Sequence, residues 1–203
     1  GLTECSGACC LSPEGMENKK DIIGIPFPNC VYKIIDINDG HELGPNEDGE
    51  ILISGPNVML GYLDEKEETE NVFTTDENGI KWLHTGDVGS IDKKGFIYYR
   101  SRLKRMIITN GYNVYPSYIE ELLSKHEYVF QCAVIGISHP YKGEVAKAFI
   151  VLKEDIKPSL EVKRVINKYL KQNLANYAIP SEIEYVEGLP MTLVGKISYK
   201  DLH

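Results

Sequence analysis

Asp87 lies in a segment whose residue types could bind a sugar. It ends the run His84-Thr85-Gly86-Asp87, which follows the apolar pair Trp82-Leu83 and precedes another apolar run, so a loop between two strands is predicted. From such a loop its carboxylate could accept hydrogen bonds from two vicinal hydroxyl groups, as acidic residues do when they bind a ribose. An aspartate that only caps a turn would produce the same pattern.

Cations are concentrated shortly after this segment. Residues 100–105 read Arg-Ser-Arg-Leu-Lys-Arg, which places four positive charges in six residues of a chain whose net charge is −8. Arg102 could donate to sugar hydroxyls or phosphate oxygens, because a guanidinium group presents a fixed fork of donors. Such a segment suits a small anionic ligand better than a polymer, and a solvated charged turn is the alternative.

Two further residues could complete a phosphate site. Lys196 follows Gly195 in a loop and could act as a point charge toward phosphate, although lysines in such loops are usually only solvated. Glu4 could bind a hard cation such as Mg²⁺, which accepts one or two carboxylates and takes further oxygens from substrate phosphates.

Apolar spacing predicts the elements that must position these side chains. Short apolar runs separated by Gly, Asp and Pro predict a β-rich module over residues 1–100. The expected strands are residues 31–35, 50–54, 81–84, 88–91 and 96–99, with a hairpin turn at residues 92–95.

The pattern changes after residue 104. Asn110-Gly111 between apolar runs predicts a β-hairpin, and Ser117 with Glu120 predicts a capping box that begins a helix. Apolar residues at helical spacing predict a second helix over residues 159–174. Strands are expected at residues 129–137, 147–152 and 183–186. The predicted fold class is therefore α+β: a small β-rich subdomain, then a module with a β-hairpin and a short sheet with helices.

Composition excludes several classes of protein. The 203 residues are 42% hydrophobic, enough for one large or two small domains. The acidic net charge disfavours nucleic acid as a partner, and the lack of an apolar run of roughly 18–20 residues disfavours an integral membrane protein. The five cysteines have no regular spacing, so neither a disulfide framework nor a zinc site is predicted, and reduced thiols in the cytoplasm are expected.

The order of the motifs is more specific than any one of them. The chain contains, in sequence, Thr3-Glu4, His84-Thr85-Gly86-Asp87, Ser101-Arg102-Leu103-Lys104, Gly111-Tyr112-Asn113-Val114-Tyr115-Pro116 and Gly195-Lys196. This series resembles the C-terminal part of the adenylate-forming (AMP-binding) enzyme superfamily, over essentially the whole chain. The His before Thr-Gly-Asp looks most like acyl-CoA synthetases, whereas Ile108 stands where luciferases place a second lysine.

The resemblance implies roles for the nucleotide-binding residues. Thr3 would touch the α-phosphate, and Glu4 would hold Mg²⁺. Asp87 and Arg102 would bind the ribose hydroxyls, and Tyr99 would pack near the nucleoside, although a buried strand aromatic would look the same.

It also implies roles in the second half of the chain. Lys104 would be the hinge between residues 1–103, the C-terminal portion of the large AMP-binding domain, and residues 104–203, a mobile α+β domain. Gly111 would line the tunnel for the pantetheine of CoA, and an ordinary hairpin glycine is the alternative. Lys196 would bridge the substrate carboxylate and the α-phosphate.

The implied reaction uses a small carboxylic acid, ATP, Mg²⁺ and CoA. The family's Gly/Ser/Thr-rich phosphate loop is not found in these residues, and the first residue is Gly1, so we expect a fragment that lacks its N-terminal lobe and is inactive alone. Two alternatives stay open: an adenylation domain that loads an amino or aryl acid onto a carrier protein, and a non-catalytic interaction module that retains the fold.

Overall fold

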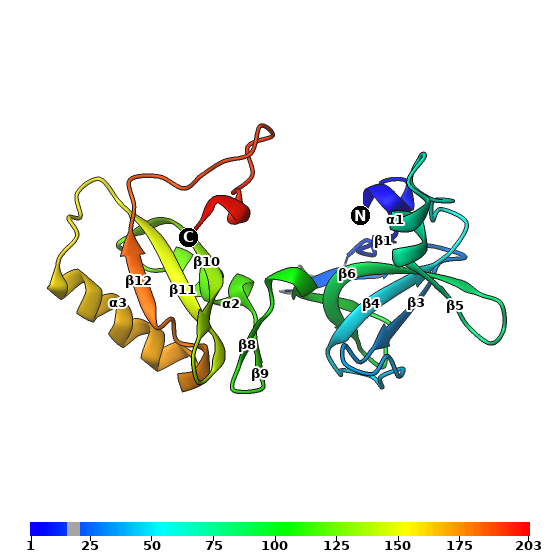
Figure 1. Cartoon of the computed structure of the whole chain (residues 1–203), viewed down its shortest axis with the longest axis horizontal. Coiled ribbons are helices and arrows are strands. Elements are labelled where there is room, and N and C mark those ends of the chain that lie inside the picture. Colours follow the sequence, from blue (N-terminus) through cyan, green and yellow to red (C-terminus); the bar gives the residue numbers. More distant parts are fainter. Residues whose placement is uncertain (16–20) are drawn as a thin grey trace. The chain divides into compact units, whose positions relative to one another are not determined.

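The computed structural model describes residues 1–15 and 21–203, which form two compact units, Gly1–Lys104 (unit 1) and Arg105–His203 (unit 2) (Figure 1). Each unit has its own sheet and its own cluster of buried apolar side chains. The fold class is α+β, as predicted from the sequence. No helix among the described residues is long and apolar enough to cross a membrane.

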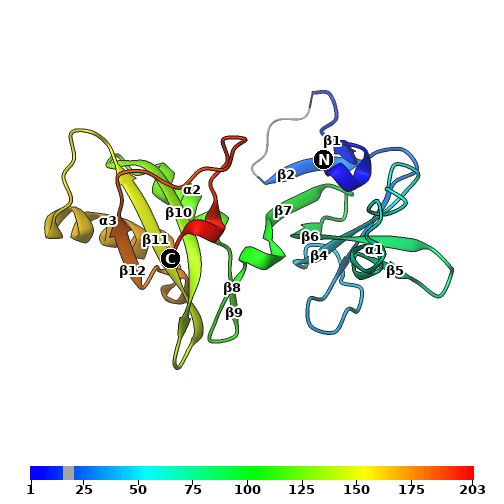
Figure 2. The same ribbon diagram turned by 45° about the horizontal axis from the view of Figure 1, so that its top comes forward.

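Unit 1 is built on an antiparallel sheet. The strand order is β1-β2-β7-β6-β4-β3, with β5 paired to β6, so β2 and β7 lie side by side (Figure 2). The elements of the described residues are η1 (Thr3–Cys5), β1 (Cys10–Leu11), β2 (Ile22–Pro26), β3 (Val31–Ile35), β4 (Gly49–Ser54), α1 (Lys66–Asn71), β5 (Phe73–Thr75), β6 (Lys81–Ile91), β7 (Ile97–Arg102) and η2 (Leu103–Arg105).

Strand β6 is longer than the sequence predicts. Residues 81–84 and 88–91 were expected to form two strands, but residues 81–91 form one. Asp87 pairs with Arg102 of β7, so the prediction that Asp87 lies in a strand-connecting loop is wrong. The polar run stays in the sheet because Gly86 has a positive φ of 65° and the register shifts beside it, which bends the strand without ending it.

The turn between β6 and β7 is confirmed. Asp92 accepts hydrogen bonds through Oδ1 from the backbone N–H groups of Lys94 (2.8 Å) and Phe96 (3.0 Å), and Gly95 has a φ of 85°. An aspartate that binds the backbone two residues on is the usual device for closing such a turn.

Unit 2 combines a sheet with two longer helices. The strand order is β10-β11-β8-β9, and β12 runs parallel to β11. The elements are β8 (Ile107–Thr109), β9 (Tyr112–Val114), α2 (Pro116–Ser124), β10 (Val129–His139), β11 (Gly143–Leu152), α3 (Leu160–Asn173), η3 (Asn176–Ala178), β12 (Glu182–Tyr185) and η4 (Tyr199–Asp201).

The helices of unit 2 cover the sheet with their apolar stripes. Ile119 and Leu123 of α2 and Ile166 and Leu170 of α3 are fully buried in one cluster with Ile150 of β11. Fully burying one such side chain stabilises a fold by roughly 1.5–3 kcal/mol. The helix predicted over residues 159–174 is therefore confirmed within one residue at each end.

Helix α2 begins differently from the prediction. The helix begins at Pro116 with Tyr115 as its N-cap, so Ser117 lies inside the first turn and the predicted capping box of Ser117 and Glu120 is wrong. The Glu120 carboxylate accepts hydrogen bonds from the backbone N–H of Val134 (2.8 Å) and from Arg105 (2.6 Å). Glu120 therefore ties the helix to β10 rather than closing its own turn.

Candidate functional site

Unit 1 contains a cavity of about 450 Å³ next to the polar part of β6. Sulfur and apolar groups line one part of it, and Thr85, Asp87 and Arg102 line another. The remaining lining residues are Gly1, Leu2, Cys9, Cys10, Ile23, Tyr32, Ile51, Ile53 and Tyr99. Three of the residues predicted from the sequence, Asp87, Tyr99 and Arg102, thus share one cavity.

Asp87 and Arg102 face each other across β6 and β7. Arg102 Nε lies 2.9 Å from Asp87 Oδ1, and Arg102 Nη1 donates to the carbonyl of Thr85 at 3.2 Å. The Asp87 side chain is 14% exposed and the Arg102 side chain 51% exposed. The arginine can therefore reach a ligand in solvent while the carboxylate stays inside the cavity.

Asp87 Oδ1 is a buried acceptor without a donor aimed at it in the described part of the chain. Its contact with Arg102 is close but does not have hydrogen-bond geometry. Burial raises the pKa of Asp87, and the Arg102 charge opposes that rise. A buried polar atom without a partner is uncommon and calls for an explanation. The Arg102 charge 2.9 Å away compensates this buried oxygen, and the 14% exposure of the Asp87 side chain leaves part of it open to a ligand in the cavity.

Neighbouring side chains hold Asp87 in place. The Thr85 hydroxyl donates to the Ile51 carbonyl at 2.6 Å and accepts the Asp87 N–H at 3.1 Å. The buried Glu50 carboxylate accepts the Gly86 N–H at 3.1 Å and lies 3.0 Å from His84 Nδ1. Sequence reasoning missed Glu50 and gave Thr85 no role. The available signal for Glu50 was its place next to the apolar residues 51–53, where a charged side chain in a predicted strand is unusual.

Asp87→Asn is expected to stabilise unit 1 at neutral pH. Because the folded-state pKa of this acid is raised, ionised Asp87 disfavours folding, and that cost disappears as the pH falls through the raised pKa toward the ordinary value of 3.8. The variant should therefore unfold at higher temperature than the parent at pH 7, with a smaller difference near pH 4. Fluorescence of Trp82, the single tryptophan of the chain, reports unfolding of unit 1 selectively.

Glu77→Gln is the matched control, because Glu77 is exposed in the loop between β5 and β6. It should change the unfolding temperature little at either pH. A lower unfolding temperature for Asp87→Asn at pH 7 would show that the ionised carboxylate stabilises unit 1, against this assignment.

Thr3 and Glu4 lie in η1, directly after the cavity residue Leu2. Thr3 is exposed and Glu4 is half-exposed. Glu4 Oε1 accepts a hydrogen bond from the Tyr62 hydroxyl at 2.9 Å, and the Glu4 carbonyl accepts the Met59 N–H at 2.7 Å. Tyr62 is a second residue to which sequence reasoning gave no role. One oriented carboxylate with its other oxygen unengaged among the described residues fits Mg²⁺, which takes most of its remaining ligands from water and phosphate.

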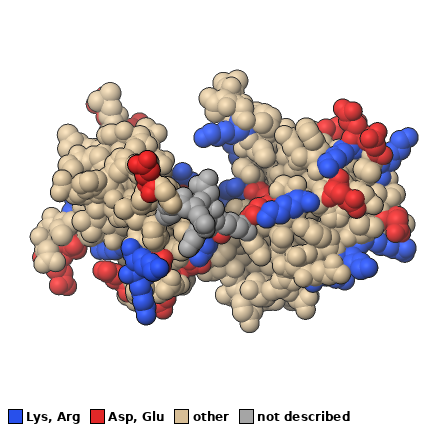
Figure 3. Space-filling view, turned by 180° about the vertical axis from the view of Figure 1, so that it is seen from behind, with Lys and Arg blue, Asp and Glu red and all other residues tan. Residues whose placement is uncertain are grey.

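The basic segment is not a cluster of equivalent cations. Arg100 Nε donates to Asp48 at 3.1 Å, Arg102 pairs with Asp87, and Arg105 Nη2 donates to Glu120 at 2.6 Å. Lys104 is exposed in η2, with no ion pair among the described residues. On the face shown in Figure 3, Lys and Arg side chains lie scattered among Asp and Glu side chains. Arg102 is therefore the segment's cation that faces the cavity.

Lys196 lies on a tight loop of unit 2. The Thr192 N–H donates to the Lys196 carbonyl at 2.7 Å, and the Lys196 N–H donates to Thr192 Oγ1 at 3.1 Å. Gly195 has a φ of 76°, which a larger residue would adopt only with strain. Lys196 itself is exposed, and its ammonium group contacts no acceptor within residues 1–15 and 21–203. The loop thus holds the backbone and leaves the charge available.

Gly111 lies at the tip of the predicted hairpin, which is confirmed. Asn110 and Gly111 have φ angles of 51° and 80°, and a Cβ at Gly111 would meet no atom within 4 Å. The backbone of a two-residue turn therefore accounts for this glycine within unit 2. Gly111 and Lys196 belong to unit 2, whereas Asp87, Tyr99 and Arg102 belong to unit 1.

Two family models match the chain. Residues 1–63 match the model of the AMP-binding enzymes, and residues 118–196 match the AMP-binding enzyme C-terminal domain. The chain belongs to the AMP-binding, or adenylate-forming, enzymes and corresponds to their C-terminal part, as the motif order predicted. Acyl-CoA ligases are among the members of that superfamily to which it is similar.

Curated relatives and solved structures agree. The chain is 36% identical over 202 residues to a long-chain-fatty-acid–CoA ligase of Salmonella typhimurium, covering 100% of this chain and 34% of that protein. It is 39% identical over 197 residues to the ligase of that name from Bacillus subtilis, covering 97% of this chain and 34% of that protein. The chain thus spans about a third of the length of these relatives.

The solved structure of o-succinylbenzoate CoA synthetase from Bacillus subtilis, in complex with its acyl-adenylate intermediate, has a TM-score of 0.85 and 35% identity; the match covers 100% of this chain and 40% of that one. The structure of the same enzyme in complex with ATP and magnesium has a TM-score of 0.84 and 34% identity, and the match again covers 100% of this chain and 40% of that one.

Proposed function

We propose that this chain is the C-terminal segment of an ATP-dependent acyl-CoA synthetase. In the first half-reaction a carboxylate attacks the α-phosphate of ATP, which releases pyrophosphate and leaves an acyl adenylate. In the second, the CoA thiol attacks the acyl carbon and AMP leaves. The observation that best supports this proposal is the buried Asp87 carboxylate paired with Arg102 at one cavity, in a chain similar to acyl-CoA ligases throughout its length.

Residues of unit 1 would bind the nucleotide. The Asp87 carboxylate accepts hydrogen bonds from the ribose hydroxyls, and Arg102 donates to them from the partly exposed side of the pair. Tyr99 packs near the nucleoside, and Thr3 contacts the α-phosphate. Glu4 holds Mg²⁺, which supplies positive charge against the developing negative charge of the phosphates.

Residues of unit 2 would distinguish the two half-reactions. Lys196 neutralises charge where the carboxylate meets the α-phosphate. The hairpin at Gly111 lines the route for the pantetheine arm of CoA. Both must reach one active site, so residues 104–203 would rotate about Lys104 relative to residues 1–103 between the two steps. We place the enzyme in the cytoplasm, where free thiols are the usual form of cysteine.

The chain alone is expected to catalyse no ATP–pyrophosphate exchange with fatty or aromatic acids. A Gly/Ser/Thr-rich phosphate loop is not found in the 203 residues, so the segment expected to hold the β- and γ-phosphates of the leaving pyrophosphate is absent from them. A chimera that joins the preceding region of the Salmonella ligase to this chain should show exchange with long-chain fatty acids. Robust exchange by the chain alone, or an inactive but folded chimera, would contradict the proposal.

The same chimera tests which thiol accepts the acyl group, that of CoA or that of a carrier protein. Formation of an acyl-CoA from CoA supports the synthetase, whereas transfer only to a phosphopantetheinylated carrier protein would support the carrier-loading alternative. The resemblance of its second half to acyl-CoA ligases favours CoA. A non-catalytic module would have no use for Asp87, Arg102 and Lys196 together.

A further inference from the structure

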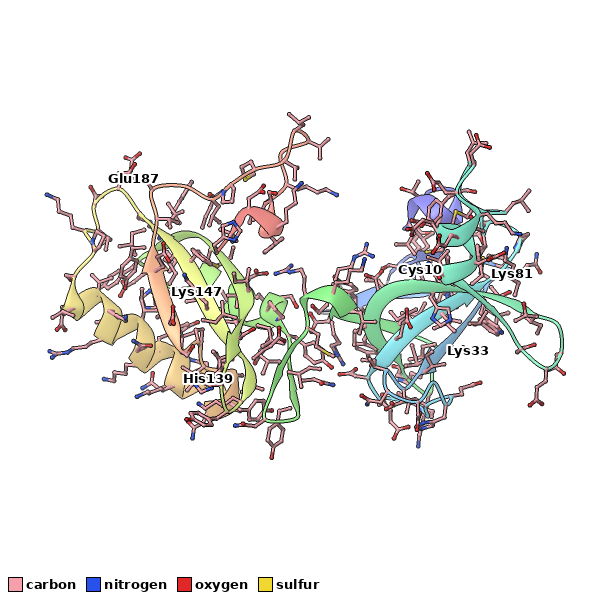
Figure 4. All side chains as sticks on the ribbon, viewed as in Figure 1. Cys10, Lys33, Lys81, His139, Lys147 and Glu187 are labelled. Carbon is pink, nitrogen blue, oxygen red and sulfur yellow. The ribbon has the colours of Figure 1, made fainter. Side chains whose placement is uncertain are left out.

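Three of the five cysteines gather in one corner of unit 1. Cys5 ends η1, Cys9 precedes β1, and Cys10 begins it; Figure 4 labels Cys10 in this part of unit 1. Cys5 is fully buried, Cys9 is 4% exposed, and Cys10 is half-buried. All three thiols are free and contribute to the same hydrophobic cluster.

A left-handed turn returns the chain so that Cys9 lies near Cys5. Ser6 and Gly7 have φ angles of 55° and 94°, and their N–H groups donate to the carbonyls of Thr3 (3.1 Å) and Leu2 (3.0 Å). Asn57 then holds the two arms of the turn, because its Nδ2 donates to the carbonyls of Ala8 (2.8 Å) and Cys5 (3.4 Å). The proximity of the two cysteines is therefore built into the backbone.

The three thiols interact with one another. The thiols of Cys10 and Cys5 neighbour the Cys9 sulfur and lower the pKa of Cys9. Within this cluster Cys9 is thus the sulfur that most readily carries negative charge, and the thiolate is the form of cysteine that reacts with oxidants.

Cys9 is also reachable by a small molecule. Cys9 and Cys10 line the 450 Å³ cavity that contains Asp87 and Arg102, so access does not depend on the outer surface. Cys132 in unit 2 is different, because burial raises its pKa to about 12 and its thiol donates to the Glu120 carbonyl. Cys132 is an internal reference for an unreactive cysteine.

We propose that Cys9 is an oxidation site at the nucleotide cavity and that Cys5 is its resolving partner. The Cys9 thiolate attacks one oxygen of hydrogen peroxide, forming a sulfenic acid and releasing hydroxide, which takes up a proton. The Cys5 sulfur then attacks the sulfenic sulfur, and the proton of its thiol leaves with the displaced hydroxide as water. In total two thiols and one peroxide yield one disulfide and two waters.

Cys5 resolves the sulfenic acid in preference to Cys10 for two reasons. The Cys10 thiol donates to the Ile23 carbonyl at 3.3 Å, which holds it against β2. A disulfide between adjacent residues also closes a small, strained ring, whereas a spacing of four residues around a turn does not.

The disulfide should also affect nucleotide binding, a consequence that rests on the proposed function. Thr3 and Glu4 lie in the same short helical turn as Cys5, and Leu2 before them lines the cavity. Drawing Cys5 into a covalent bond with Cys9 displaces this turn. Oxidised chain should therefore bind AMP more weakly than reduced chain.

The test is peroxide treatment of the 203-residue chain at pH 7, followed by alkylation and mass spectrometry. The three cysteines lie in the tryptic peptide of residues 1–19, in which fragmentation identifies the linked pair. A Cys5–Cys9 disulfide should form at least tenfold faster than Cys132 is oxidised. A Cys9 that stays reduced, a Cys9–Cys10 bond, or equal reactivity of Cys132 would overturn the proposal.

Variants separate the two roles. Cys5→Ser should stop the reaction at a Cys9 sulfenic acid that dimedone captures, and Cys10→Ser should leave the disulfide intact. Trp82 fluorescence checks that each variant is folded; if one is not, the mapping of the parent chain decides alone. Calorimetric titration with AMP tests the linkage, and equal affinities of reduced and oxidised chain would overturn it. Reduced chain that binds no AMP would contradict the nucleotide assignment, while a mapped disulfide would still stand.

Discussion

Lys196→Ala in the active chimera is expected to slow acyl-adenylate formation by about 10²–10³-fold, by analogy with the loss of one oxyanion-stabilising donor. Two anions must approach each other in this half-reaction, and Lys196 would neutralise charge between them. Its ammonium group has no partner in the described part of unit 2, so the substitution removes a charge without breaking a structural contact. Thioester formation from supplied acyl adenylate should change little, because the mixed anhydride bond between the carboxylate and the α-phosphate is already made.

Separate assays of the two half-reactions measure this difference. Lys171→Ala is the matched control, because Lys171 is an exposed lysine in the last turn of α3, and it should leave both rates unchanged. Equal losses in both half-reactions would mean that Lys196 supports the structure rather than the chemistry of adenylation.

Lys104→Pro in the same chimera is expected to slow thioester formation at least about tenfold more than adenylation, a difference of about 1.4 kcal/mol in barrier. The boundary between the two units falls directly after Lys104, within η2. Proline holds φ near −65° and also restricts Leu103 before it. A joint that must adopt two backbone conformations would then be confined to one.

Lys104→Ala is the control, because it removes the charge but keeps the backbone dihedrals available. It should leave the ratio of the two rates near that of the parent. A proline variant whose second step is unaffected would place the hinge elsewhere, and equal loss of both steps would indicate local misfolding.

Local patterns were enough to identify much of this protein. The order of Thr3-Glu4, His84-Thr85-Gly86-Asp87 and Gly195-Lys196 indicated the superfamily, and the comparisons confirm it. The turn at residues 92–95 and the helix over residues 159–174 were also predicted correctly. These features depend on residues close together in the chain, where turn chemistry and apolar spacing act directly.

Contacts between distant segments decided the rest. Asp87 stays in β6, against the prediction, because its neighbours Thr85 and Gly86 donate hydrogen bonds to acceptors on β4. The Thr85 hydroxyl donates to the Ile51 carbonyl, and the Gly86 N–H donates to the Glu50 carboxylate. Glu120 binds β10 rather than capping α2, since the Val134 N–H lies within its reach. The roles of the individual site residues remain predictions.

The ligand-binding character of the site was likewise decided by tertiary structure. Whether Arg100, Arg102 or Arg105 faces a ligand depends on which carboxylate lies opposite each one, and those carboxylates come from other strands and helices. The burial of the Asp87–Arg102 pair and the meeting of Cys9 with Asp87 at one cavity also arise only when the sheet folds. A sequence specifies residue types and local geometry, but burial and pairing are properties of surfaces that meet only in the folded chain.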